Sequence, residues 1–165
     1  MKTSIVQNMD QAIAVMHGVG KWMEESGMNP SKWWKPENLN QEFLLQYIKP
    51  EEFYVALADG EPAAAEILQT SQDAQDWQNI DKEKLRPALY IHWLCVDRKF
   101  AGKGLPKVMI DFAKRFANEK GLNLLRVDTS ADETKLRKVY EDLGFKLVAE
   151  EQEDYRKTAF YQMEI

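Results

Sequence analysis

The chain has 165 residues, 44% of them hydrophobic and 30% charged, so we expect one globular domain over residues 1–165. Its formal charge of −5 argues against nonspecific electrostatic binding of nucleic acid. The chain has one cysteine and two histidines, which excludes a disulfide framework and a cysteine-rich zinc site. No apolar run approaches the roughly 20 residues that span a bilayer, and no secretory signal is visible, so we expect a cytoplasmic protein with no metal and no membrane partner.

Hydrophobic periodicity and turn signals predict the order of the elements. The predicted helices run from Asn8 to Gly27, over 40–48, over 105–119 and from Ser130 to Gly144, and the predicted strands cover 53–58, 63–69, 88–97, 123–129, 145–149 and 157–164. Asp59-Gly60 predicts a hairpin turn, and Ser130 with Glu133 predicts a capping box. Residues 70–86 are polar with weak periodicity and are expected to form a loop. This order predicts an α/β fold with a mixed, mostly antiparallel central sheet and helices on both faces.

The most informative stretch joins the predicted strand 88–97 to the helix that follows it. Gly102 and Gly104 form a Gly-X-Gly turn there, and Pro106 is tolerated in the first helical turn. Glycines let the backbone approach an anion closely, and the free amides and the helix dipole then face that anion. Residues 98–110 carry four basic side chains and no acid. This local excess of positive charge predicts a phosphate site, with a tight turn capped by solvated lysines as the alternative.

Two segments resemble hallmarks of the GNAT family of N-acetyltransferases. The family's motif A reads Gln/Arg-x-x-Gly-x-Gly/Ala, and this chain reads Lys99-Phe100-Ala101-Gly102-Lys103-Gly104. The stretch from Leu136 to Phe145 is similar to the family's Leu-x-x-x-Tyr-Glu-x-Leu-Gly-Phe helix end, and the similarity covers about residues 88–149. It implies a GNAT-like fold. Lys99, Pro106 and Glu133 depart from the family pattern, where Gln or Arg, a small residue and a cofactor-holding Asn are usual.

The resemblance also implies a cofactor and an acceptor. Acetyl-CoA would be the co-substrate, and a primary amine of a small molecule or peptide would attack it directly in a ternary complex. The implied cofactor contacts are Leu94, Val96, Lys99, Ala101, Gly102, Lys103 and Gly104. A CoA-binding sensor or interaction domain with little catalysis and a longer-chain acyltransferase stay open as alternatives, and so does a homodimer.

His92 is the candidate general base. Period-two alternation places Tyr90, His92, Leu94 and Val96 on one strand face. His92 lies four residues before Val96, an offset at which several amine acetyltransferases carry His or Glu, and an imidazole titrates near neutrality. The alternatives are a hydrogen-bonded core histidine, a water-linked residue, and Tyr90 as the base.

Tyr140 is the candidate general acid. It lies on the apolar stripe of its helix, which favours a core aromatic, but the resemblance implies a hydroxyl near the cofactor sulfur that protonates the departing thiolate. Cys95 is expected in the core. The tryptophans Trp33, Trp34 and Trp77 are expected in loops, where they would line an acceptor pocket or pack half-buried.

Overall fold

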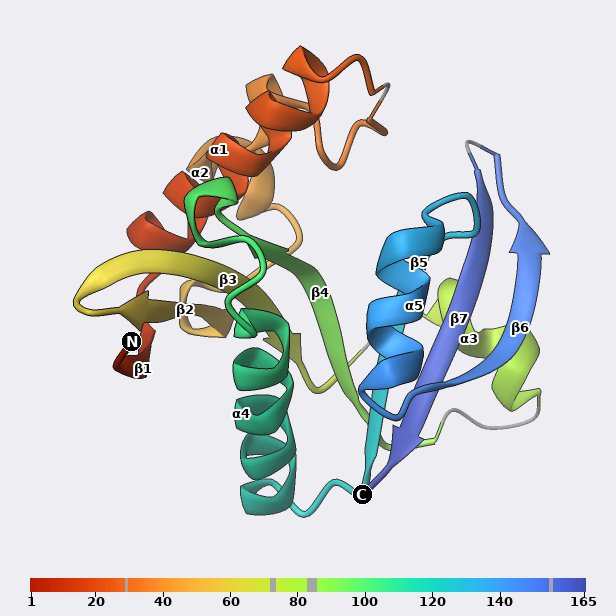
Figure 1. The fold of residues 1–165 in the computed structure, drawn as a ribbon. Helices are drawn as coiled ribbons and strands as arrows, with labels where there is room; N and C mark the ends of the chain where they lie inside the picture. The colour runs from red at the N-terminus through yellow and green to blue at the C-terminus, as the bar shows by residue number, and fades with distance from the viewer. Residues whose placement is uncertain (29, 72–73, 83–85, 155) are drawn as a thin grey trace. The chain divides into compact units, whose positions relative to one another are not determined.

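The fold is that of a computed structural model, which describes residues 1–28, 30–71, 74–82, 86–154 and 156–165 (Figure 1). Its strands form one mixed sheet in the order β1-β2-β3-β4-β5-β7-β6, and helices flank it. The strands are β1 (Thr3–Gln7), β2 (Phe53–Ala58), β3 (Glu61–Gln69), β4 (Leu89–Val96), β5 (Leu124–Ser130), β6 (Lys146–Gln152) and β7 (Lys157–Glu164). The helices are α1 (Met9–Glu25), α2 (Gln41–Leu44), α3 (Ala74–Asp81), α4 (Leu105–Glu119) and α5 (Thr134–Asp142), with single 3₁₀ turns at Pro36–Asn38, Pro50–Glu52 and Arg98–Phe100.

The chain divides into two compact units. The first comprises residues 1–67 and 93–109, and the second comprises residues 68–92 and 110–165. The single domain expected over residues 1–165 stays a prediction. None of the helices in the described ranges combines the length and the apolar character needed to cross a bilayer.

In the first unit, the β2–β3 hairpin separates two apolar cores. Phe53 and Val55 pair with Ile67 and Ala65, and these side chains pack in one core with the apolar stripe of α1. On the alternate positions, Ala56 and Ala64 pack in another core with Leu105 and Met109 of α4. Successive residues of a strand point to opposite faces, so helices cover both faces of this part of the sheet, as the sequence predicted.

Sequence signals located most elements, but the structure differs from the predicted elements in several places. The N-cap at Asn8 is confirmed, because its side chain accepts from the Gln11 amide at 2.9 Å. The short strand β1 was not predicted. It pairs antiparallel with β2 at the end of the sheet order, and its strand conformation depends on this pairing rather than on a local sequence signal. The second helix is shorter than 40–48, since α2 ends at Leu44 and Leu45 caps it.

The predicted capping box of α5 is wrong. Glu133 is the N-cap residue, but its side chain makes no capping hydrogen bond. Instead its carboxylate accepts from the Thr129 hydroxyl at 3.4 Å, and its amide donates to the Ser130 carbonyl at 3.1 Å. Glu133 is therefore drawn back toward the end of β5 rather than onto the first turn of the helix.

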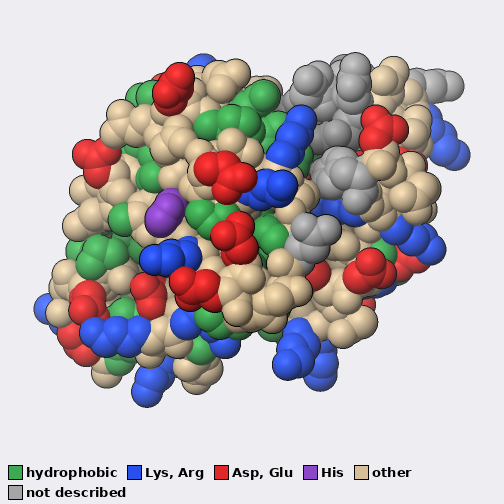
Figure 2. All heavy atoms as spheres, turned by 90° about the horizontal axis from the view of Figure 1, so that it is seen from above, with side chains coloured by type: hydrophobic (Ala, Val, Ile, Leu, Met, Phe, Trp, Pro, Cys, Tyr) green, Lys and Arg blue, Asp and Glu red, His purple; other side chains and the backbone are tan. Residues whose placement is uncertain are grey.

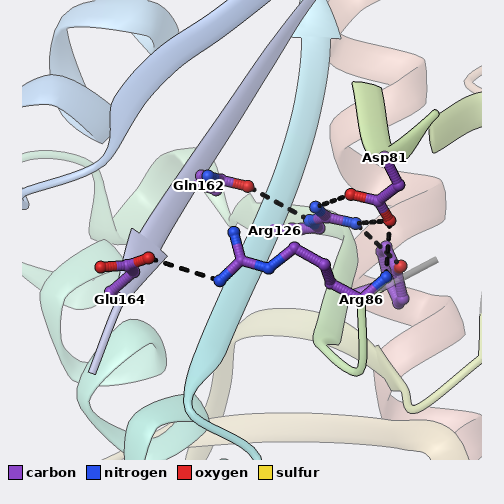
Figure 3. A network of polar contacts seen from close by, with 6 residues as sticks. Asp81, Arg86, Arg126, Gln162 and Glu164 are labelled. Atoms are coloured by element: carbon purple, nitrogen blue, oxygen red, sulfur yellow. Dashed lines mark hydrogen bonds and ion pairs between the residues drawn. The ribbon is translucent and has the colours of Figure 1, made fainter. Parts of the chain in front are cut away.

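The loop expected over 70–86 contains α3, and a buried ion pair explains why. The Arg126 guanidinium binds both carboxylate oxygens of Asp81, at 2.8 and 2.5 Å, with the two side chains 0% and 2% exposed (Figure 3). Trp77 of α3 is fully buried, and the guanidinium lies 4.4 Å from its ring centroid. Trp77 was thus wrongly expected in a loop, because tertiary contacts to β5 override a weak local pattern.

Further hydrogen bonds complete this network in the second unit. Arg126 also contacts the Tyr90 hydroxyl at 3.3 Å and the Gln162 side-chain oxygen at 3.3 Å. Burial by itself raises the pKa of Asp81, but the hydrogen bonds and charge of Arg126, with the Arg86 amide at 2.7 Å, outweigh it and lower that pKa. Asp81 therefore stays ionised and holds α3 against β5.

Glu66 of β3 is a buried carboxyl with no hydrogen-bond partner in the described part of the chain. It is 0% exposed, and it pairs in register with Tyr54 of β2. Burial raises the pKa of Glu66 well above its usual value, because the charged form loses its hydration. The folded protein therefore holds a proton on Glu66 at pH values where the unfolded chain has lost it.

We expect Glu66→Gln to flatten the pH dependence of stability. In the parent, the free energy of unfolding falls as pH rises from about 4.3, the usual carboxyl value, up to the raised pKa, by at most about 1.4 kcal/mol per pH unit. Gln keeps the shape and cannot ionise, so its advantage over the parent should grow with pH. Urea unfolding at a series of pH values measures this, with Glu24→Gln on the exposed side of α1 as the control. Parallel curves for Glu66→Gln and the parent would contradict it.

Candidate functional site

The turn between β4 and α4 begins with a self-contained cap. The carboxylate of Asp97 accepts from the Lys99 amide at 2.9 Å, and its carbonyl accepts from the Phe100 amide at 2.8 Å. The Arg98 carbonyl accepts from the Ala101 amide at 3.2 Å, while the Asp97 amide donates to the Ala63 carbonyl of β3 at 2.8 Å. The backbone donors of residues 99–101 are thus already used, and the turn is fixed to the sheet.

The next residues present open backbone donors. Gly102 and Gly104 have φ of +77° and +78°, a left-handed conformation that glycine adopts without cost. Residues 101–104 are exposed, and the amides of Gly102, Lys103 and Gly104 make no hydrogen bond within the described part of the chain. A Cβ placed on either glycine would meet no atom within 4 Å, so open space lies above the turn.

The turn leads directly into the N-terminus of α4. Leu105 begins this helix, and its side chain is fully buried in the core with Met109, which fixes the direction of the helix axis. A helix N-terminus carries partial positive charge on its unpaired amides. The arrangement can therefore bind an anion with the open amides of 102–104 and the dipole of a 15-residue helix.

The basic side chains around the turn differ in availability. The Lys99 ammonium forms an exposed ion pair with both oxygens of Glu61, at 2.8 and 2.9 Å, and the Arg98 guanidinium lies 4.1 Å from the ring centroid of Trp22. Lys103 is exposed on the turn itself. On the face seen in Figure 2, acidic and basic side chains are interspersed with hydrophobic ones. Because it is exposed beside the open amides, Lys103 is placed to meet an anion bound there.

Leu94 and Val96 share one strand face, as predicted, and pack in the core that holds Leu105 and Met109. Trp93 and Cys95 pack in the opposite core with α1. Trp93, however, has a φ of +51°, which interrupts the extended backbone of β4.

The left-handed φ of Trp93 contradicts the regular alternation of side chains predicted for residues 90–96. Side chains alternate between the two faces of a strand only where the backbone is extended, and Trp93 breaks that extension. The alternation therefore no longer predicts that His92 and Tyr90 lie on the same face as Leu94. The sequence offered no signal for it, because Trp93 is an aromatic residue in a strongly apolar strand run.

The two proton-transfer candidates lie in the second unit. His92 is half-buried and directly precedes Trp93. Tyr140 of α5 is 4% exposed, and its ring packs on Phe145 at 5.6 Å and on Tyr161 at 6.1 Å between centroids. The ring of Tyr140 is thus a core aromatic, while the catalytic roles of both residues stay predictions. Tyr90 is buried, and its hydroxyl accepts a hydrogen bond from Arg126. This arrangement suits a structural role for Tyr90 better than the role of a general base.

Other chemistry-bearing residues are accounted for by packing. Cys95 is 7% exposed, and burial raises its pKa to about 12, so its thiol stays protonated as expected of a core residue. Trp33 and Trp34 are half-buried in the segment between α1 and α2. Within the residues described, no three His, Cys, Asp or Glu side chains are grouped so that they could hold a metal ion.

Comparison with known proteins identifies relatives of this chain. Residues 19–145 match the Acetyltransferase (GNAT) family. The chain is 21% identical over 153 residues to the uncharacterized N-acetyltransferase YesJ of Bacillus subtilis (strain 168), covering 92% of this chain and 84% of that protein.

Solved structures agree with this match. A GNAT-family acetyltransferase from Streptococcus agalactiae has a TM-score of 0.76 at 16% identity, covering 99% of this chain and 95% of that one. The PaiA N-acetyltransferase from Thermoplasma acidophilum, solved in complex with coenzyme A, has a TM-score of 0.72 at 17% identity, with 100% of both chains covered. The predicted fold class is thereby confirmed.

Gly104→Glu should weaken CoA binding at least tenfold, or about 1.4 kcal/mol. The substitution places a carboxylate beside the open amides and forces a residue with a Cβ into a left-handed conformation. Gly121→Glu is the matched control, because Gly121 has φ +72° and equally open space but follows the opposite end of α4. Calorimetry on both folded variants decides: equal CoA affinities would show that the turn is not the anion site.

Proposed function

Because the chain belongs to the Acetyltransferase (GNAT) family, we propose that it transfers an acetyl group from acetyl-CoA to a primary amine of a small molecule or peptide, by direct attack in a ternary complex. The observation that carries this proposal is the turn at 101–104, whose open amides precede α4 and leave room for a pyrophosphate. The complex of the PaiA enzyme with coenzyme A supports the same cofactor. We place the protein in the cytoplasm and leave a homodimer as a further prediction.

The residues of the turn and of β4 fit this cofactor. The amides of Gly102, Lys103 and Gly104 would hold the pyrophosphate, and Lys103 would neutralise part of its charge. The Ala101 amide already donates to the Arg98 carbonyl, so Ala101 would line the cofactor site without donating to the pyrophosphate. Lys99 can join after leaving Glu61, since an exposed ion pair contributes only about 0–1 kcal/mol. The backbone of Leu94 and Val96 would pair with the pantetheine arm. Bound acetyl-CoA supplies the activated thioester, and no metal is required.

Acetyl transfer also needs a general base, backbone N–H groups that polarise the thioester, and a general acid from this chain. His92 would accept the ammonium proton of the acceptor, directly or through water, so that the amine can attack. Backbone N–H groups of β4 near Leu94 would polarise the carbonyl of the scissile thioester. The hydroxyl of Tyr140 would give a proton to the departing thiolate.

Turnover with an amine panel tests the proposal directly. Free CoA thiol should appear only when acetyl-CoA and an amine are both present, and mass spectrometry should find the acetylated acceptor. The panel should include small primary amines and peptides, with Gly104→Glu at limiting acetyl-CoA as the comparison that should show reduced turnover. CoA binding without turnover for any amine would instead make the protein a CoA-binding sensor, and turnover only with longer acyl donors would make it a longer-chain acyltransferase.

If His92 is the base, His92→Ala should lower kcat/KM by about 10²–10⁴-fold and remove an ionisation from the pH–rate profile. The rate of the parent should fall as pH drops through the pKa of the imidazole, because the protonated ring cannot accept the ammonium proton. His17→Ala, an exposed histidine of α1, should leave the profile unchanged. A His92→Ala profile that overlays the parent would show that His92 is structural, and Tyr90 or a water would become the candidate base.

Tyr140→Phe should lower kcat roughly 10-fold or more, with little change in stability or CoA affinity, because the ring keeps its packing on Phe145. Tyr161→Phe is the matched control. The Tyr161 hydroxyl accepts from Arg137 at 2.8 Å and donates to Glu141 at 2.9 Å, so its loss should lower Tm and spare kcat. If Tyr140→Phe instead lowers Tm and keeps full kcat, the acid assignment is wrong.

A further inference from the structure

Trp93 carries backbone strain in the middle of the strand proposed to bind the cofactor. Its φ of +51° is a genuine outlier for a bulky residue and costs about 1–3 kcal/mol. Such a conformation persists only where the surrounding structure holds it. The next residue in the chain is Leu94, whose backbone lies in the stretch proposed to polarise the thioester.

One contact within the first unit joins the side chain of this residue to a distant part of the chain. The indole Nε1 of Trp93 donates to the carbonyl oxygen of Trp33 at 2.8 Å, and the two rings pack edge to face with centroids 6.0 Å apart. Trp33 is itself fixed by Tyr47 at 5.0 Å and Phe43 at 5.9 Å. We call this the Trp33–Trp93 contact. It ties β4 to the segment between α1 and α2.

Hydrogen bonds within that segment fix the position of the Trp33 carbonyl. The Trp34 amide donates to the Ser31 carbonyl at 2.9 Å and closes a turn around Trp33. The Asn38 side chain donates to the Lys32 carbonyl at 2.9 Å and anchors the turn from its other end.

The segment also lies directly on α1. A Cβ on Gly20 would be 2.7 Å from the Trp34 carbonyl oxygen and 2.6 Å from a Leu39 methyl group, so only glycine permits this approach. The position of the Trp33 carbonyl therefore depends on the absence of a side chain at Gly20.

We propose that Trp93 is a positioning residue, held through the Trp33–Trp93 contact, which sets the backbone of Leu94 for acetyl transfer. This inference rests on the proposed function. The open amides at 102–104 have their own support in the Asp97 cap, so the contact acts mainly on the transfer step. Of the proposed cofactor contacts it reaches only the pairing of Leu94 with the pantetheine arm.

Trp93→Phe is the direct test, because it keeps an aromatic ring and removes the indole donor. We expect kcat to fall about 10–100-fold, the loss typical of a misplaced reacting geometry, while CoA affinity measured by calorimetry falls by no more than about threefold, since only the pairing of Leu94 with the pantetheine arm is disturbed. A folded Trp93→Phe enzyme with the kcat of the parent would overturn the proposal. A parallel loss of CoA affinity and kcat would overturn it as well, because the contact would then support the fold or the cofactor site.

Gly20→Ala tests the same contact from a distance. Its methyl group must displace the Trp34 carbonyl, so it should lower kcat as Trp93→Phe does and speed hydrogen exchange of the Trp93 indole N–H in NMR spectra. Gly18→Ala is the matched control on the same helix, since nothing lies within 4 Å of its Cβ, and it should retain the parent's kcat. Equal kcat for Gly20→Ala and Gly18→Ala would contradict the proposal.

The two proposals fail in different ways. If the parent enzyme turns over no amine, the proposed function fails, whereas the exchange rate of the indole N–H still reports the contact. If the parent turns over and the Trp93→Phe and Gly20→Ala variants match it, only the positioning role fails.

Discussion

The feature on which the proposed activity depends is a backbone constraint at the end of β4. Amide groups can converge on an anion only where the chain leaves them unpaired and still holds them rigidly. Asp97 holds the chain rigidly by capping the amides that precede the turn. Gly102 and Gly104 leave the following amides unpaired by adopting left-handed conformations. Because nothing crowds either glycine, their necessity lies in the backbone angle and in the approach of a ligand rather than in protein packing.

The same strand combines rigid and strained backbone within a few residues. Leu94 and Val96 pack on one core while Trp93 and Cys95 pack on the other, so β4 is clamped between two apolar layers in the first unit. This clamp explains how a left-handed tryptophan can persist. Packing on both sides and the indole hydrogen bond to Trp33 together offset the cost of the angle.

The parts of the fold that sequence predicts well are those with local signals. The helix over 105–119 and the hairpin at Asp59-Gly60 follow from periodicity and turn chemistry, and the turn at 102–104 follows from two glycines between a strand and a helix. Helix α3 and the φ of Trp93 could not be predicted, because each depends on partners far along the chain: Arg126 for α3 and Trp33 for Trp93. The ion pair between Lys99 and Glu61 escaped for the same reason, since 38 residues separate its members.

Burial decides which ion pairs are structural and which stay available for binding. Arg126 and Asp81 are almost fully buried and doubly bonded, so removal of either partner would strand a buried charge at a cost of about 3–5 kcal/mol. Lys99 and Glu61 have the same kinds of charge, but more than half of each side chain is exposed, so water can replace either partner at little cost. The first pair therefore fixes a helix to the sheet. In the proposed complex with acetyl-CoA, the second would let Lys99 exchange the Glu61 carboxylate for a more strongly charged phosphate beside the open amides.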